Sequence, residues 1–275
     1  MATVSMAAVK ELRERLGAGM VDSKNALVEA EGDIEKAIEI LRLKGMKGVA
    51  KREGRATSEG LIAVKESEGS ATMIELACET DFVAKNEKFI ALGQRVLDAV
   101  VAAGAKTLEE AVAAPLEGKT VAEIMTDEAA IIGEKVELRR IAVVEGEHIA
   151  VYLHQTSKDL PPQVGVVVGF AGGSADTGTG IAQHISFADP LYVDRDGVPE
   201  ADVAKERDLV TEIAQNEGKP AAALPKIIEG RLSGFFKTVV LLEQDYARDS
   251  KQSVRKVLEN EGMTISGFAR FKVGA

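Results

Sequence analysis

Few residues of this 275-residue chain are of the types that do covalent or metal chemistry. The three histidines, His148, His154 and His184, lack the helical spacing of a zinc-binding pair, and Cys78 has no second cysteine with which to form a cluster or a disulfide. Cys78 ends an apolar run, which is typical of a buried, unreactive thiol. The sequence therefore predicts no catalytic residues, no metal site and no cofactor.

A glycine-rich segment, Gly-Phe-Ala-Gly-Gly-Ser at 169–174, lies between a predicted strand and a predicted helix. Backbone amides at such a position can bind phosphate. The segment lacks the G-x-G-x-x-G spacing, and the chain contains no G-x-x-x-x-G-K-[ST] motif. A connecting loop over 172–180 is therefore the favoured interpretation, and a nucleotide-using enzyme remains the alternative.

The most distinctive short segment is Thr-Asp-Phe-Val-Ala-Lys at 80–85, which places a carboxylate and an aromatic ring between a strand and a helix. Two interpretations stay open. In the first, Asp81 caps a turn and Phe82 packs into the core, as short polar side chains and phenylalanine commonly do. Alternatively, Phe82 is exposed as an aromatic anchor for a protein partner.

The composition and net charge of the chain argue against several classes of protein. The chain has 34 Lys and Arg against 44 Asp and Glu, so its net charge is 34 − 44 = −10. That charge argues against nonspecific binding to nucleic acid or to an anionic membrane surface. The apolar runs are too short to span a bilayer, and we expect no targeting segment, because the first residues lack a basic stretch followed by an apolar one. We expect a cytoplasmic protein of about two domains, at roughly 150 residues each.

Residues 1–55 have the apolar spacing of three short helices. Gly17 and Gly19 are expected to end the first helix, Asp22 to cap the second and Asp33 to cap the third. A basic linker with a domain boundary near residue 55 follows, and its cations are Lys44, Lys47, Lys51, Arg52 and Arg55.

Residues 56–140 are expected to form the first half of an α+β core. Apolar runs at 61–64 and 73–78 flank a polar turn and predict a hairpin. A helix that begins after Asn86 follows. Capping-box spacing marks the starts of two further helices, at Thr107 with Glu110 and at Thr120 with Glu123.

Residues 141–198 repeat the order of strand, loop and helix. Strands at 136–144 and 149–153 are expected to pair with each other, and a strand at 164–170 leads through the glycine-rich loop to a helix at 181–187. Short connections favour antiparallel pairing. The sequence thus predicts an α+β fold with two related antiparallel-sheet-plus-helix subdomains.

The remainder of the chain is predicted to leave the core and return to it. Apolar spacing between residues 199 and 242 predicts a projecting helical hairpin, assigned to 199–229 as a domain, and 230–275 returns to the second subdomain. In that last part Ser250 is expected to cap a helix and Gly262 to end it. A strand at 265–273 closes the chain.

Together these segments resemble the bacterial elongation factor Ts family. The similarity is carried by segments that occur in the family's order, at 9–24, 30–37, 80–85, 132–140, 181–184 and 267–274. The resemblance implies that residues 1–55 form a three-helix bundle of the ubiquitin-associated type. It also implies a protein that binds elongation factor Tu with GDP and promotes GDP release, which allows GTP to bind.

The resemblance further implies which residues contact the partner. Asp81 and Phe82, flanked by Thr80 and Val83, would enter the GTPase domain near its Mg²⁺ site, and the helix of His184 would press on a neighbouring part. The residues expected to touch a GTPase-domain helix from the N-terminal bundle are Arg13, Met20, Val21 and Lys24. Elongation factor Tu is the implied partner, without direct nucleic-acid or membrane contact. A homodimer and a heterotetramer with elongation factor Tu both stay open, as does a passive adaptor whose activity resides in 1–55.

Overall fold

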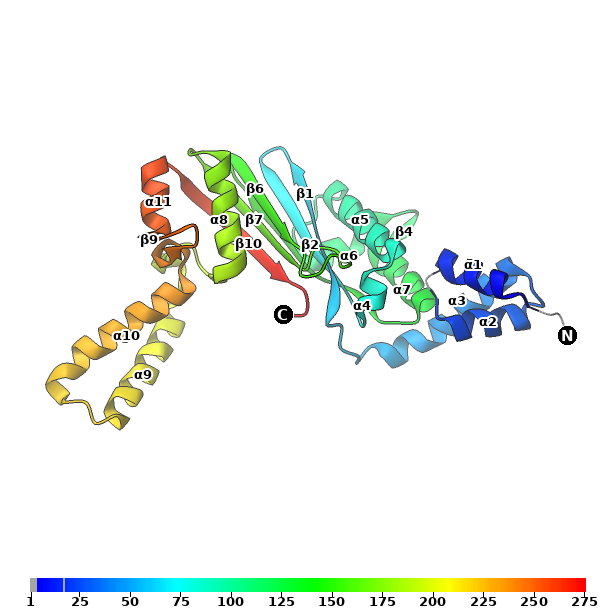
Figure 1. Cartoon of the computed structure of the whole chain (residues 1–275), viewed down its shortest axis with the longest axis horizontal. Coiled ribbons are helices and arrows are strands. Elements are labelled where there is room, and N and C mark those ends of the chain that lie inside the picture. Colours follow the sequence, from blue (N-terminus) through cyan, green and yellow to red (C-terminus); the bar gives the residue numbers. More distant parts are fainter. Residues whose placement is uncertain (1–3, 17) are drawn as a thin grey trace. The chain divides into compact units, whose positions relative to one another are not determined.

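The structure is a computed structural model that describes residues 4–16 and 18–275 (Figure 1). The chain divides into two compact units. The first holds the described residues up to 143 together with 153–165 and 271–275, and the second holds 144–152 and 166–270. Helices and antiparallel sheets occur together, which confirms the predicted α+β class. The finer five-part division of the chain stays a prediction.

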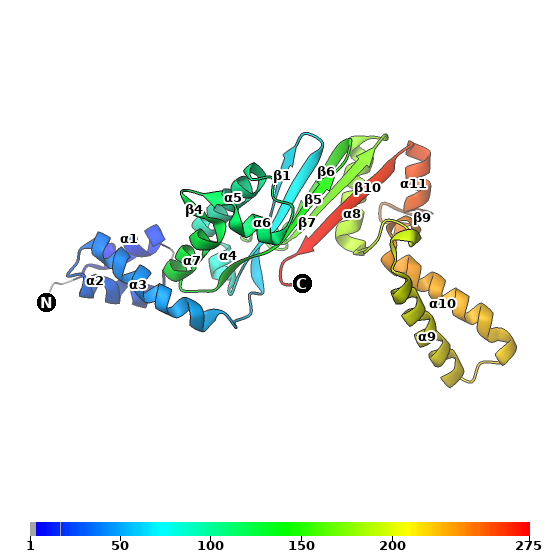
Figure 2. The same cartoon turned by 180° about the vertical axis from the view of Figure 1, so that it is seen from behind.

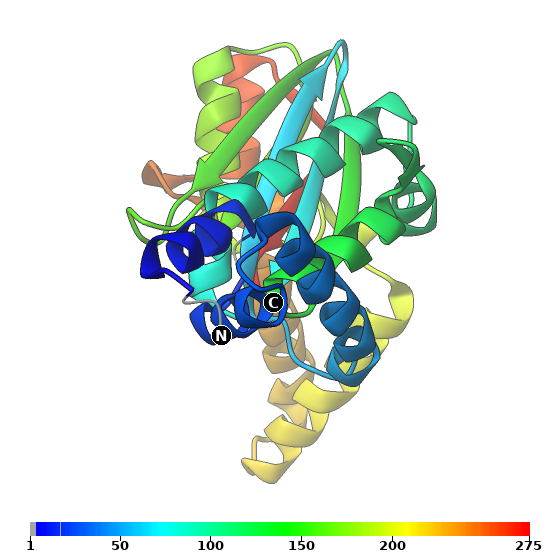
Figure 3. The same cartoon turned by 90° about the vertical axis from the view of Figure 1, so that its right-hand side faces the viewer.

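The N-terminal helices are α1 (Met6–Leu16), α2 (Met20–Glu29) and α3 (Ile34–Arg52), drawn in blue in Figure 3. Their shared core includes Leu12, Leu27 and Leu41. Asp33 caps α3 as predicted, because its side chain accepts a hydrogen bond from the amide of Lys36.

Two expectations for this region need correction. Asp22 does not cap α2: the helix begins at Met20 after Gly19, and the first helical hydrogen bond already runs from the amide of Ser23 to the carbonyl of Gly19. The predicted basic linker is helical through Arg52, because α3 continues to that residue. Gly17, expected to end α1, lies outside the described residues.

The first sheet has the strand order β1-β2-β5, with β1 at Glu59–Ser67, β2 at Ser70–Cys78 and β5 at Val136–Glu145. The predicted hairpin is confirmed, and its register runs from Glu59 opposite Cys78 to Ser67 opposite Ser70. Both capping boxes are confirmed as well. The remaining elements of this part are α4 (Asp81–Ala84), α5 (Glu87–Ala102), α6 (Leu108–Ala113), β3 (Pro115–Leu116), β4 (Lys119–Thr120) and α7 (Val121–Ile132).

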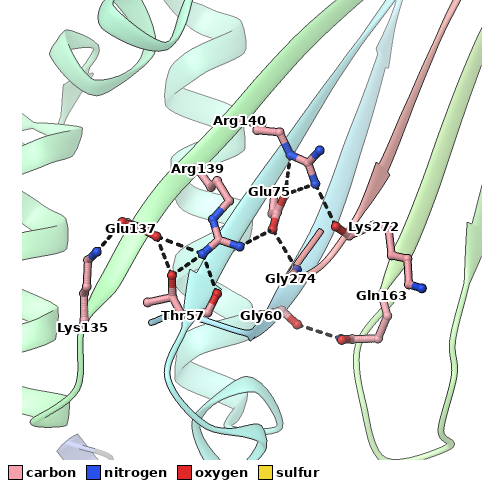
Figure 4. A network of polar contacts seen from close by, with 10 residues as sticks. All are labelled: Thr57, Gly60, Glu75, Lys135, Glu137, Arg139, Arg140, Gln163, Lys272 and Gly274. Atoms are coloured by element: carbon pink, nitrogen blue, oxygen red, sulfur yellow. Dashed lines mark hydrogen bonds and ion pairs between the residues drawn. The ribbon is translucent and has the colours of Figure 1, made fainter. Parts of the chain in front are cut away.

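A buried carboxylate joins three segments of the first unit (Figure 4). The side chain of Glu75, on β2, is fully buried and accepts hydrogen bonds from Arg139 Nη1 at 3.2 Å and Arg140 Nε at 2.6 Å, both on β5. The amide of Gly274 approaches Glu75 Oε1 at 3.3 Å, and Arg140 Nη2 donates to the carbonyl of Lys272 at 2.8 Å. The last residues of the chain are therefore fastened to β2 and β5.

The second sheet has the strand order β10-β7-β6, with β6 at His148–His154, β7 at Val164–Ala171 and β10 at Thr264–Lys272. The expected pairing of 136–144 with 149–153 is wrong, because β5 and β6 belong to different sheets. Between β5 and β6 lies Gly146, where an added Cβ would stand 2.8 Å from the Cα of Gly169 on β7. The chain passes against β7 there and continues into the second sheet.

The predicted loop over 172–180 is also wrong beyond its first residues. Helix α8 spans Ala175–Ala188, because the side chain of Ser174 caps it by accepting a hydrogen bond from the amide of Thr177 at 3.1 Å. Gly178 lies inside the helix, where an added Cβ would stand 2.8 Å from the ring of Phe170. Gly172 packs against the carbonyl of Gly262, and a Cβ added at Gly172 would stand 2.3 Å from that oxygen. These glycines permit close packing.

The predicted helical hairpin is formed by α9 (Glu200–Asn216) and α10 (Leu224–Val239), drawn in yellow and orange in Figure 2. Ser250 does not cap the last helix, because it lies in a strand and Ser253 provides the cap. No helix of the described chain is long and apolar enough to cross a membrane. The other elements are η1 (Arg195–Gly197), η2 (Ala221–Ala223), η3 (Leu241–Glu243), β8 (Asp245–Tyr246), β9 (Asp249–Ser253) and α11 (Val254–Glu261).

Replacing Glu75 with Gln should lower the free energy of unfolding by about 3 kcal/mol, because two half-buried arginines would then lose their shared carboxylate. Urea denaturation monitored by circular dichroism measures the change. Glu66→Gln, at an exposed position on β1, is the matched control and should have little effect. Equal effects of the two substitutions would contradict the structural role of Glu75.

Candidate functional site

Phe82 projects into solvent directly after the end of β2. The one-turn helix α4 carries it, and its side chain is 81% exposed. The interpretation in which Phe82 packs into the core is therefore wrong. Lys85 Nζ lies 5.9 Å from the centre of the ring. Burial of a phenylalanine side chain is favourable by about 1.5–3 kcal/mol, and the exposed ring of Phe82 forgoes this free energy. The ring is therefore available to a partner.

The neighbours of Phe82 on α4 face the other way. Ala84 is buried, and Val83 packs against the apolar cluster that includes Leu76 and Phe89. The amide of Ala84 donates to the carbonyl of Thr80 at 3.1 Å. One side of this helical turn is thus anchored in the core, and the opposite side presents the aromatic ring.

Thr80 begins α4 and makes hydrogen bonds with all of its polar groups. Its hydroxyl donates to Glu134 Oε1 at 2.7 Å, and its amide donates to Glu134 Oε2 at 3.0 Å. Its carbonyl accepts a hydrogen bond from the Cys78 thiol at 3.3 Å. Burial raises the pKa of Cys78 to about 12, so this thiol stays protonated and does not act as a nucleophile.

Asp81 pairs with Lys85 one helical turn later. Lys85 Nζ donates to Asp81 Oδ2 at 2.6 Å, and this hydrogen bond is the main reason why the pKa of Asp81 is lowered. Asp81 is therefore ionised at neutral pH. Among residues 4–16 and 18–275 there is no group of three or more His, Cys, Asp or Glu side chains able to hold a metal ion.

The four predicted N-terminal contact residues are all exposed. Arg13 lies in the last turn of α1, and Met20, Val21 and Lys24 lie in the first turns of α2. Val28 was not among the predicted residues, although it is an exposed apolar residue seven positions after Val21 and so on the same helical face. An i, i+7 apolar pair outside the buried stripe was the signal that could have found it.

His184 lies in the second unit and is not exposed. Its side chain is 1% exposed and bridges Gln244 Oε1, 2.9 Å from Nε2, and the amide of Ala247, which donates to Nδ1 at 3.1 Å. Since Nδ1 accepts, Nε2 carries the proton and donates. Burial lowers the pKa of His184, so the neutral ring is the stable form. The ring holds the segment 244–247 against α8.

The exposed residues of this part of the chain are Phe187, 85% exposed near the end of α8, and Leu191 just beyond it. Their backbone is held firmly. Arg270 donates to the carbonyl of Ser186 at 3.2 Å and pairs with Asp189 at 2.7 Å. The sequence predicted Phe187 only as part of a helix at 181–187, and the apolar pair Phe187 and Leu191 around a proline was the signal that could have marked it.

The two other histidines lie on neither α4 nor α8. His148 and His154 are the first and last residues of β6, and both are exposed. The ring of His148 lies 5.4 Å from that of Phe170. The structure therefore brings Thr80, Asp81, Phe82 and Val83 together at the start of α4.

Comparison with known proteins identifies the family. The family described as Elongation factor TS matches residues 79–275. Proteins named Elongation factor Ts are similar along their whole length: that of Clavibacter sepedonicus is 68% identical over 275 residues, that of Leifsonia xyli subsp. xyli 66% over 276, and that of Beutenbergia cavernae 54% over 281, with 100% of each chain covered. The chain therefore belongs to the elongation factor Ts family.

Proposed function

We propose that this protein is a guanine-nucleotide exchange factor that binds elongation factor Tu with GDP and promotes GDP release, so that GTP can bind. Family membership supports the partner. The observation that carries the mechanism is the exposed ring of Phe82, which stands beside an ionised carboxylate on a turn anchored in the core.

The proposed activity requires no bond to be broken. A protein that binds the nucleotide-free GTPase more tightly than the GDP form must lower the affinity for GDP by the same factor. Each tenfold acceleration of GDP release requires a release barrier lower by about 1.4 kcal/mol. A few side chains that disturb the Mg²⁺ and phosphate site are sufficient, which agrees with a surface built from Asp81 and Phe82.

Other exposed residues would contribute further contacts with the partner. Arg13, Met20, Val21 and Lys24 supply an exposed apolar and basic surface on α1 and α2. In the second unit, Phe187 is an exposed aromatic residue of α8. His184 would then act on α8 from inside, as a positioning residue.

The proposal includes the setting in which the protein works. Exchange on elongation factor Tu belongs to translation in the cytoplasm, and it needs neither a cofactor of this chain nor direct contact with nucleic acid or membrane. The helical pair α9 and α10 is a candidate surface for assembly. A homodimer and a heterotetramer with elongation factor Tu remain alternatives that sedimentation of the mixed proteins separates.

Phe82→Ala should slow exchange strongly. Loss of a central aromatic anchor commonly costs about 2 kcal/mol of binding, which corresponds to roughly a 30-fold loss. The measurement is the rate at which a fluorescent GDP analogue leaves elongation factor Tu as a function of exchange-factor concentration. Leu108→Ala removes an exposed apolar side chain from α6 and is the control. If the wild-type protein does not accelerate release, the proposed function is wrong; an unaffected Phe82→Ala variant would reject only the proposed mechanism.

The buried neutral ring of His184 makes stability depend on pH. Because its pKa is lower in the folded state than its ordinary value of 6.5, the unfolded chain binds the proton more readily. Its contribution to the free energy of unfolding is complete above pH 6.5 and is lost as the pH falls toward the lower folded pKa. Urea denaturation between pH 5 and 7.5 should show a smaller loss in His184→Gln than in the wild type. His148→Gln, at an exposed ring, should behave like the wild type, and an identical pH dependence in all three proteins would refute this role.

A further inference from the structure

The segment Ile-Gly-Glu-Lys-Val-Glu-Leu-Arg-Arg at 132–140 is distinctive in the sequence, yet no residue of it has a place in the proposed contacts with the partner. Its first residues lie beside α4. Gly133 ends α7 in the left-handed conformation, with φ of 85°, and this turn directs Glu134 away from the helix axis. The Glu134 side chain, half-buried, meets Thr80.

The two residues are joined in a bidentate manner. Both oxygens of the Glu134 carboxylate are used, one by the hydroxyl of Thr80 at 2.7 Å and one by its amide at 3.0 Å. Hydrogen bonds to an ionised acceptor are roughly twice as strong as neutral ones. Two donors of a single residue, held by one carboxylate, fix the position and the direction of that residue.

The other hydrogen bonds of Thr80 are local. Its carbonyl accepts from Cys78 and Ala84, and its hydroxyl oxygen accepts from the amide of Val83 at 3.4 Å. Glu134 is 54 positions away in the sequence. Of the hydrogen bonds of Thr80 named here, those to Glu134 therefore connect the start of α4 to a distant part of the sequence. Phe82 follows Thr80 by two residues, so its position depends on that of Thr80.

We propose that Glu134 is a positioning residue for exchange: by holding the amide and hydroxyl of Thr80, it sets the direction in which Phe82 projects toward the partner GTPase. This inference rests on the proposed function. Glu134 itself acts through Thr80. Without the carboxylate, α4 samples other orientations, and the apparent affinity for the partner falls in proportion to the fraction of molecules that remain correctly oriented.

The central test compares Glu134→Ala with Glu110→Ala. Glu110 is a matched control because it accepts hydrogen bonds from the amides of Lys106 and Thr107 at the start of α6, so its loss also removes a cap. GDP-analogue release is measured against exchange-factor concentration, and thermal unfolding is measured for both variants. We expect Glu134→Ala to raise the half-saturating concentration roughly tenfold, as the loss of charge-assisted hydrogen bonds does, while Glu110→Ala exchanges like the wild type.

A double-mutant cycle shows whether Glu134 acts through Phe82. If it does, Glu134→Ala should cause little further loss in a Phe82→Ala background, whereas independent effects would add. Glu134→Gln keeps one acceptor oxygen and should recover part of the lost exchange. Hydrogen exchange at the amides of 81–85 should accelerate in Glu134→Ala and stay unchanged in Glu110→Ala.

The outcomes separate this inference from the proposed function. Wild-type exchange together with wild-type activity of Glu134→Ala, or fully additive losses with Phe82→Ala, would overturn the role of Glu134 and leave the proposed function intact. If the wild-type protein does not promote nucleotide exchange, the proposed function and the role of Glu134 are both rejected. If hydrogen exchange at the amides of 81–85 is unchanged in Glu134→Ala, the claim that Glu134 fixes the direction of α4 is rejected. If Glu134→Ala does not fold, Glu134→Gln is judged by the same assays.

Discussion

The proposed function depends on the exposure of the Phe82 side chain. A phenylalanine ring in water forgoes the burial energy that would otherwise draw it into the core. Its position is maintained because the residues around it are committed elsewhere. Val83 and Ala84 occupy the core side of α4, and Thr80 is held by hydrogen bonds. Turning the ring inward would expose the two apolar neighbours and break those bonds. Packing and hydrogen bonding thus keep the ring outside, and a ring ordered in advance would lower the entropic cost of binding a partner.

The features that the sequence predicted well are those fixed by local chemistry. The predicted helix starts at Asp33, at Asn86 and at the two capping boxes are confirmed, since a cap is made within a few residues of the helix start. The hairpin of β1 and β2 follows for the same reason, because its turn and its register lie in one short segment. Features decided by distant packing were predicted less well. The pairing of β5 with β6 failed because β5 instead joins the sheet of β2, and no local pattern records that choice.

Glycines and histidines illustrate a second limit. Gly172 and Gly178 suggest a mobile loop when read along the chain, yet their role is to let Gly262 and the ring of Phe170 approach the backbone. Sequence patterns record that a side chain is missing without recording which distant atom fills the space. His184 was correctly expected on a helix, but its burial could not be derived, since its partners Gln244 and Ala247 are about 60 residues away. Its family position suggests contact with a partner, whereas its geometry favours support from within.

Exchange by linkage explains why so few exposed residues would carry the activity while so many buried ones support them. The exchange factor must bind one state of its partner better than another, so its contact residues need defined directions more than they need reactivity. Under the proposed mechanism, groups behind the contact residues set these directions. Glu134 fixes Thr80 beneath one exposed ring, and Arg270 and His184 hold the backbone beside another. Substitutions at such residues would change exchange through orientation, with little loss of contact area, and their effects should therefore depend on the aromatic ring that each supports.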